Sequence, residues 1–141
     1  LVQSAVIADV AGRFRSVGDH GALDEDGYLY IEPRRTDLIN VAGENVYPAE
    51  VEAVLVRCPG VVDAAVTAVP DDRLGARPVA LVTCWAATPP DERDVIAFCR
   101  GRLSGFKVPR QVYVVDRIPH TPAGKIDRRR VADMVATEIQ D

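Results

Sequence analysis

Three polar stretches of this 141-residue chain, which we expect to be loops, carry residue types that chemistry uses and that folding alone does not demand: residues 18–21, 34–52 and 118–127. A carboxylate such as Asp19 accepts hydrogen bonds, and cations such as Arg34 and Lys125 form charge-assisted bonds to oxygen anions. Glycines such as Gly43 and Gly124 relieve constraints on the backbone. These stretches are therefore the candidate functional segments of the chain.

The distribution of charge along the chain points the same way. The net charge is only −4, but residues 1–99 hold 8 basic and 16 acidic side chains, a balance of −8. Residues 100–130 hold 9 basic and 2 acidic side chains, a balance of +7, and residues 131–141 return to −3. A basic segment on an acidic protein indicates a local anionic partner, such as a phosphorylated ligand or nucleic acid, unless it is simply a solvated face.

Several familiar motifs are absent from the sequence. The pair Gly124-Lys125 lacks the earlier glycine and the following Ser or Thr of a phosphate-binding loop, and no G-x-G-x-x-G follows an expected strand. The acidic turn at residues 24–27 lacks the rest of a calcium loop. His20 and His120 stand alone, and the cysteines lack zinc-type spacing. We therefore expect no metal site in this chain.

The apolar pattern predicts the elements that would hold these stretches. Acidic and glycine residues at 24–27 form a turn before a strand at 28–31, which together indicate a hairpin. Short strands at 38–41 and around Val46 flank a turn at 42–45. The remaining expected elements are a helix from Pro48 to about Cys58, strands 61–69 and 78–85 with a connector at 71–77, a helix from Thr88 to about Leu103, a strand at 111–115 and a helix at 127–139.

This order of elements predicts an α+β fold: an N-terminal β-hairpin, then a small three-stranded sheet packed with about three helices. A hydrophobic content of 48% and a charged content of 27% are those of a globular domain. No apolar stretch is long enough to span a bilayer, so we expect no transmembrane segment. Cys58, Cys84 and Cys99 form no close pair in the sequence, which predicts reduced thiols in the cytoplasm.

In order along the chain, the three stretches resemble the carboxyl-terminal part of the adenylate-forming superfamily, which includes acyl-CoA synthetases, peptide-synthetase adenylation domains and luciferases. The stretches read G-D-H-G, then R-R-T-D-L-I-N-V-A-G-E-N-V-Y-P-A-E-V-E, then I-P-H-T-P-A-G-K-I. The segment F-K-V-P at residues 106–109 is also similar to the family's Y-K-V-P. The resemblance extends from about Gly18 to Arg130, and its ending Y-P-A-E-V-E is closest to the acyl-CoA synthetases.

The resemblance implies roles for the residues singled out above. Asp19 corresponds to the carboxylate that accepts hydrogen bonds from the ribose of ATP, and Arg34 to the arginine that meets the nucleotide near the domain junction. Lys125 corresponds to the catalytic lysine that reaches the substrate carboxylate and the α-phosphate during adenylation. Gly43 corresponds to the glycine that lines the pantetheine passage, and Gly124 shapes the loop of the lysine.

The sequence departs from the family pattern at three positions. Val17 stands where the family usually has Thr, and Pro33 where it has Gly. Thr36 stands at the hinge, usually Asp or Lys, about which the family swings this domain between an adenylation pose and a thioester pose. A neutral hinge residue lacks the usual charge, but the motion itself does not require that charge.

The resemblance also implies that the chain is incomplete as a catalyst. Residues 1–33 correspond to the end of a large amino-terminal domain, and residues 34–141 to the carboxyl-terminal lid. The expected substrates are ATP, CoA and a carboxylic acid, for which we expect a fatty acid, and Mg²⁺ would be bound mainly by the large domain. The expected partner is that domain, and we expect the isolated chain to be inactive.

Two alternatives remain open at the level of sequence. Within the family, the chain could belong to an adenylation domain that loads a carrier protein instead of CoA. From another class, it could be a non-catalytic module whose basic segment binds nucleic acid, with an affinity that falls steeply as salt rises. Few aromatic residues interrupt the basic segment, which argues against binding of single strands, so we expect no nucleic-acid partner.

Overall fold

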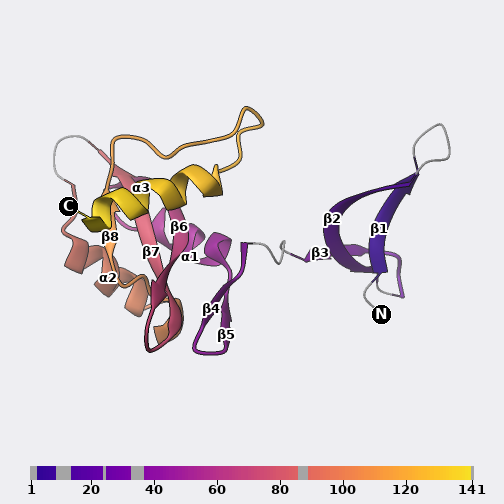
Figure 1. Cartoon of the computed structure of the whole chain (residues 1–141), viewed down its shortest axis with the longest axis horizontal. Coiled ribbons are helices and arrows are strands. Elements are labelled where there is room, and N and C mark those ends of the chain that lie inside the picture. Colours follow the sequence, from indigo (N-terminus) through magenta and orange to yellow (C-terminus); the bar gives the residue numbers. More distant parts are fainter. Residues whose placement is uncertain (1–2, 9–13, 24, 33–36, 86–88, 141) are drawn as a thin grey trace. The chain divides into compact units, whose positions relative to one another are not determined.

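Two compact units follow one another along the chain, Leu1–Asp37 and Leu38–Asp141. The computed structural model describes residues 3–8, 14–23, 25–32, 37–85 and 89–140 (Figure 1). In the first unit, the strands β1 (Gln3–Ala8), β2 (Phe14–Leu23) and β3 (Leu29–Glu32) form an antiparallel sheet in that order. The expected hairpin is confirmed as β2–β3, in which Leu23 pairs with Leu29.

Two features of the first unit differ from the sequence prediction. The strands β1 and β2 occupy a region that showed only weak patterning, and residues 18–21 lie within β2 where we expected a loop. The reason is that β2 has a partner on each side: Gly21 pairs with Gln3 of β1 and with Ile31 of β3. Backbone pairing on both edges therefore holds a polar, glycine-containing segment in a strand that its side chains do not predict.

The second unit begins with a two-stranded hairpin and a helix. The strands β4 (Ile39–Val41) and β5 (Glu44–Val46) pair antiparallel, and α1 (Pro48–Leu55) follows directly. Proline in the first helical position and Glu50 in the first turn suit a helix amino terminus. These elements match the strands, turn and helix that the sequence predicts for residues 38–58.

A three-stranded sheet in the order β6-β7-β8 forms the centre of this unit. The strands β6 (Val61–Asp71) and β7 (Gly75–Cys84) are antiparallel, and β8 (Val112–Val114) pairs parallel with β7. The helix α3 (Arg128–Gln140) crosses one face of the sheet, whereas α1 and α2 (Glu92–Arg100) lie on the other (Figure 1). A short 3-10 turn, η2 (Gly105–Lys107), lies between α2 and β8. The whole is the α+β fold that the sequence predicts.

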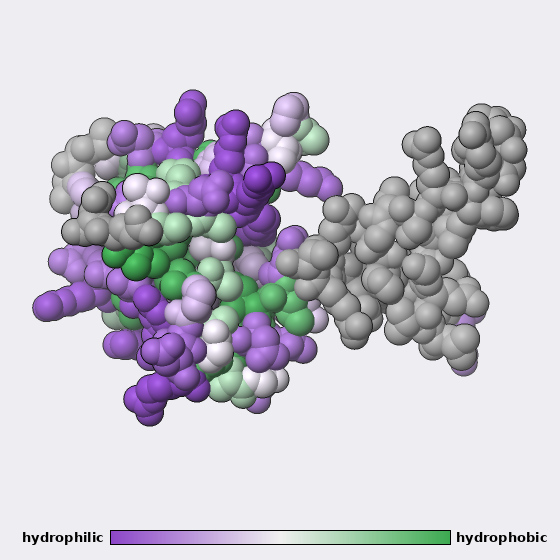
Figure 2. Space-filling model, viewed as in Figure 1, coloured by the Kyte–Doolittle hydropathy of each residue, from purple (hydrophilic) through white to green (hydrophobic). Residues whose placement is uncertain are grey.

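The two faces of the sheet form two apolar clusters. The larger one joins α1 and α2 to the sheet through residues such as Val51, Leu55 and Val95, and the smaller one seats Val131 and Val135 of α3 against Leu81. All six side chains are fully or almost fully buried. Charged and polar side chains cover most of the visible exterior of this unit (Figure 2). No helix among the described residues is long and apolar enough to cross a bilayer.

Two boundaries in the second unit correct the sequence prediction. The expected connector at residues 71–77 shrinks to a turn, because β6 and β7 remain paired as far as Asp71 and Gly75. The side chain of Asp71 accepts hydrogen bonds from the backbone of Arg73 and Leu74, which tightens the turn. The amino-terminal cap of α2 is Asp91, whose side chain accepts from Arg93 N–H at 2.7 Å. The expected cap Thr88 lies outside the described residues; a proline at residue 90 disfavours helical backbone just before it.

The three cysteines, distant in the sequence, all pack in the larger apolar cluster and are free thiols. Burial raises the pKa of Cys99 to about 11. In the unfolded chain a thiol has a pKa of about 8.5, so between these values the unfolded state holds fewer protons than the folded state. We therefore expect the free energy of unfolding to fall as the pH rises from about 8.5 to 11.

Urea unfolding at several pH values measures this dependence. Because other groups also titrate in alkali, the informative comparison is with the variant Cys99→Ala. This variant should lose less stability between pH 8 and pH 10.5 than the wild type does. Equal losses in the two proteins would contradict the assigned role of the buried thiol.

Candidate functional site

The backbone of the loop that carries Lys125 is closed by its own hydrogen bonds. Thr121 N–H donates to the carbonyl of Lys125 at 2.7 Å, and Gly124 N–H donates to the carbonyl of Thr121 at 2.9 Å. The Thr121 hydroxyl oxygen accepts from Lys125 N–H at 3.3 Å. Gly124 has a φ of +80°, a left-handed conformation that glycine adopts at little cost. The loop is therefore a small, shaped platform for Lys125.

The side chain of Lys125 is exposed and forms no ion pair with the described residues. This distinguishes it from Lys107, the other lysine of the chain, whose ammonium group lies 2.7 Å from Glu50 Oε1. An exposed cation on a shaped loop can reach an anion outside this unit. The geometry of the loop thus fits the role that the sequence assigned to Lys125.

Gly43 lies at the tip of the β4–β5 hairpin. The two central residues of this turn, Ala42 and Gly43, have φ values of +52° and +91°, and the Gly43 N–H donates to Asn40 Oδ1 at 3.0 Å. A Cβ atom built on Gly43 would meet no atom within 4 Å, so the tip is open. The turn conformation by itself favours glycine here, and the open tip leaves room for a ligand chain to pass close to the backbone.

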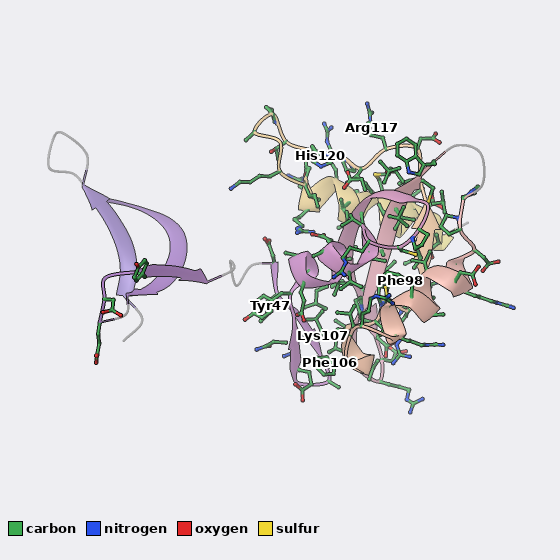
Figure 3. The ribbon with its side chains drawn as sticks, turned by 180° about the vertical axis from the view of Figure 1, so that it is seen from behind. Tyr47, Phe98, Phe106, Lys107, Arg117 and His120 are labelled. Carbon is green, nitrogen blue, oxygen red and sulfur yellow. The ribbon has the colours of Figure 1, made fainter. Side chains whose placement is uncertain are left out.

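These two loops lie at opposite ends of the second unit (Figures 1 and 3). The tip of the β4–β5 hairpin lies beside the β6–β7 turn, to which it is joined by a hydrogen bond of 2.8 Å from Ala42 N–H to the Leu74 carbonyl. The loop of Lys125 extends from the other end of the sheet, just before α3. Lys125 and Gly43 therefore cannot contribute to one small site in a single orientation of this unit.

A basic pocket accompanies the hairpin end. It has a volume of about 370 Å³ and is lined by Asp71, Arg73, Leu74, Arg77 and Arg110. The Arg77 guanidinium donates to Gln111 Oε1 at 2.6 Å and lies 3.8 Å from Asp71 Oδ2, so it is held in place. Three arginines with one aspartate leave net positive charge here. Sequence reasoning missed this pocket because its members come from the β6–β7 turn and from the segment before β8.

The basic segment at residues 100–130 does not form one continuous patch. Lys107 pairs with Glu50, and Arg128 pairs with the buried Glu52, so acidic residues from the first part of the chain neutralise both. Arg102 stacks over the ring of Phe98 at 3.7 Å. Figure 3 shows Lys107 near Phe106 and Tyr47 at the hairpin end, far from His120 at the other end. Part of the charge segregation seen in the sequence is thus complementarity between parts of the fold.

The remaining sequence candidates all belong to the first unit, Leu1–Asp37. The backbone of Asp19 lies in β2, next to His20, which pairs with Ser4 and Glu32. Arg34 and the expected hinge residue Thr36 lie outside the described residues. In the part of the chain that the structure describes, no three His, Cys, Asp or Glu side chains come together in a way that could hold a metal ion.

An ion pair that sequence reasoning did not anticipate lies between the two loops. Glu52 of α1 is only 8% exposed, and Arg128 at the start of α3 contacts both of its carboxylate oxygens. The two residues are 76 positions apart in the sequence. The acidic position in the segment P-A-E-V-E and the arginine soon after Lys125 carried no signal of pairing, because charged residues in such segments are usually exposed.

The fold and the two loops define an α+β domain that presents one of these loops at each end. Residues 50–125 match the family model described as AMP-binding enzyme C-terminal domain. The matched region is more than half of the chain, and the chain belongs to this family. The resemblance noted in the sequence is therefore confirmed.

The relatives that match are ligases several times longer than this chain. A 2-succinylbenzoate–CoA ligase from Geobacillus kaustophilus is 47% identical over 89% of this chain and 26% of its own length. The fatty acid–[acyl-carrier-protein] ligase ScoC from Streptomyces coeruleorubidus is 46% identical over 82% of this chain and 22% of its own. The structure of o-succinylbenzoate CoA synthetase from Bacillus subtilis, in complex with an acyl-adenylate, superposes with a TM-score of 0.73 at 36% identity, covering 88% of this chain and 25% of that one. The chain thus spans about a quarter of the length of these relatives.

Proposed function

We propose that this chain is the mobile carboxyl-terminal part of an ATP-dependent acid–thiol ligase of the acyl-CoA synthetase type. In this proposal residues 1–33 are the end of the large amino-terminal domain and residues 34–141 are the lid. The observation that carries the proposal is that the loop of Lys125 and the β4–β5 hairpin with Gly43 lie at opposite ends of one compact unit. A lid that rotates can present first one end and then the other to a single active site.

In the first half-reaction, a carboxylate oxygen of the substrate attacks the α-phosphorus of ATP. The new bond gives an acyl-adenylate, and pyrophosphate leaves with the electrons of the broken P–O bond. Lys125, exposed and without an ion pair among the described residues, is the cation that this chain would place between the carboxylate and the α-phosphate. Its positive charge would offset the negative charge that two approaching anions bring together.

In the second half-reaction, the CoA thiol loses its proton to water and its sulfur attacks the acyl carbonyl carbon; a C–S bond forms, and AMP leaves with the electrons of the broken C–O bond. The open hairpin tip at Gly43 would border the passage of the pantetheine arm. The arginines of the neighbouring pocket, Arg73, Arg77 and Arg110, would meet phosphates of CoA outside that passage. This pocket favours CoA over a carrier protein as the acceptor.

The other assignments belong to the same proposal. Asp19 would accept hydrogen bonds from the ribose of ATP, Arg34 would meet the nucleotide, Thr36 would be the hinge, and Gly124 would shape the loop of Lys125. Mg²⁺ would be bound mainly by the large domain. A cytoplasmic location stays a prediction from the cysteines. The chain by itself is expected to give no turnover with ATP, CoA and a fatty acid.

The identity of the carboxylic acid substrate is tested with a panel of acids. The resemblance led us to expect a fatty acid, and the relatives include 2-succinylbenzoate–CoA ligases as well as a fatty acid ligase. Acids of both kinds should therefore be compared by pyrophosphate release in the complete ligase.

The assignment to CoA is tested by comparing acceptors in the complete ligase. We expect the double variant Arg73→Ala/Arg110→Ala to raise the KM for CoA about a hundredfold or more, because each arginine lost removes a charge-assisted bond worth about 1.5 kcal/mol or more. With pantetheine, which has no phosphate, the same variant should behave like the wild type.

The matched control is Arg93→Ala, which removes an exposed arginine of α2 that forms no ion pair with the described residues. It should leave the KM for CoA unchanged. A carrier protein that accepts the acyl group faster than CoA, or an equal effect of the double variant on CoA and pantetheine, would contradict the proposal.

A further inference from the structure

The buried pair Glu52–Arg128 connects the elements that carry the two functional loops. Glu52 lies in the middle of α1, which begins two residues after the β4–β5 hairpin with Gly43. Arg128 is the first residue of α3 and follows Lys125 by three positions. The two loops are at opposite ends of the unit, so this pair is the polar link between their supports.

The contacts of the pair extend to the central sheet. Arg128 Nη2 donates to Glu52 Oε2 at 3.0 Å, and Arg128 Nη1 donates to Glu52 Oε1 and to the carbonyl of Val66 at 3.2 Å. Val66 N–H in turn donates to Glu52 Oε1 at 2.8 Å. Two parallel bonds of this kind fix the orientation of a guanidinium group as well as its position. The arginine is thus held against both α1 and β6.

The loop of Lys125 is attached to the unit at both ends and through two of its own side chains. Ile118 at one end is 3% exposed. Within the loop, His120 Nε2 lies 3.6 Å from Asp63 Oδ2 of β6, and Ile126 packs against the smaller apolar cluster. The backbone hydrogen bonds of the loop are internal, including Asp127 N–H to the Pro119 carbonyl at 2.9 Å. The other end runs directly into Arg128, so a change in where Arg128 sits loosens the end of the loop that follows Lys125.

We propose that Glu52 and Arg128 are positioning residues for the adenylation half-reaction. The pair holds the Lys125 loop in register with α1 and β6, so that the unit moves as one body and presents Lys125 at a defined place. This inference rests on the proposed role of Lys125. The placement of a reacting group matters steeply, since an error of about 1 Å can cost about a hundredfold in rate.

The first test measures the two half-reactions separately in the complete ligase. Arg128→Met should lower the rate of acyl-adenylate formation about tenfold or more, and should change thioester formation from preformed acyl-adenylate less than about twofold. The control Arg129→Met removes the neighbouring exposed arginine and should change neither rate. Arg128→Lys keeps the positive charge without the planar guanidinium group, and it preserves the fold more easily. It should also slow adenylation more than thioester formation, by a smaller factor than Arg128→Met.

A double-mutant cycle separates positioning from a general structural effect. If Arg128 acts through Lys125, then Arg128→Met should cost less than about twofold in adenylation once Lys125→Ala is present. An undiminished loss in that background, or equal losses in both half-reactions, overturns the inference. If Lys125→Ala alone leaves adenylation intact, the proposed function of Lys125 fails instead.

The second test does not depend on activity and uses the 141-residue chain. Amide hydrogen exchange in Arg128→Met should be about tenfold or more faster at Gly124 and Asp127, whose N–H groups are hydrogen-bonded within the loop. The amide of Ala42 at the opposite end should keep its wild-type rate. Unchanged exchange in the loop, or equal acceleration at both ends, overturns the positioning role whether or not the ligase reaction is confirmed.

Discussion

Replacing Lys125 with alanine in the complete ligase should lower the rate of acyl-adenylate formation by about 10²–10³-fold. This is the size of loss that follows when one preorganised group is removed from charge that develops in a transition state. Thioester formation from preformed acyl-adenylate should be nearly unaffected, because the end of the unit that carries Gly43 would face the active site in that step. Pyrophosphate release and thioester formation measure the two steps separately.

Lys107→Ala is the matched control for this experiment, since Lys107 is the other lysine of the chain and pairs with Glu50. We expect this variant to adenylate the acid at the wild-type rate. An equal loss of both half-reactions in Lys125→Ala would refute the assigned role of Lys125. A lysine that merely kept the lid folded would produce such an equal loss.

Glu52→Ala should lower the free energy of unfolding of the chain by about 2 kcal/mol, because it removes one partner of an ion pair whose carboxylate is buried and whose guanidinium is 29% exposed. The Arg128 guanidinium would then lack its carboxylate partner, and the Val66 N–H would lose its hydrogen-bond acceptor. Urea unfolding followed by far-ultraviolet circular dichroism measures the change.

Glu50→Ala is the control, because it removes a glutamate from the same helix. The side chain of Glu50 is 43% exposed and pairs with Lys107, and exposed pairs contribute about 0–1 kcal/mol. We expect Glu50→Ala to change stability by no more than that. A loss for Glu52→Ala as small as the loss for Glu50→Ala would show that the pair contributes little to the fold.

Local chemistry was enough to predict much of the second unit. Proline and glutamate placed the start of α1, the spacing of Val51 and Leu55 placed its buried face, and the apolar runs located β6 and β7. The prediction was wrong about the length of the connector at residues 71–77, because backbone pairing continues through residues whose side chains are polar. Apolar patterns report burial of side chains, and a solvated strand gives no such signal.

The first unit shows the same limit more strongly. The stretch around Asp19 looked like a loop, but β1 and β3 pair with β2 on its two edges. Strand partners come from other parts of the chain, so the pairing that decides the structure lies outside any local window.

The sequence by itself determined which residues could do chemistry. Residue type and motif order single out Lys125, Gly43 and Gly124. The two loops that carry them can be identified from the sequence alone. Motifs of this kind are local, and their backbone conformations depend on neighbours a few residues away.

Only the tertiary structure decided how these residues are arranged. It placed the loop of Lys125 and the hairpin of Gly43 at opposite ends of one unit, gathered three arginines into a pocket beside the hairpin, and paired Glu52 with Arg128 beside the edge strand β6. The physical reason is that charge pairing and burial depend on distances in space between residues far apart in the sequence. The net balance of +7 at residues 100–130 showed that cations were present, but the fold decided which of them were neutralised and that Lys125 was not.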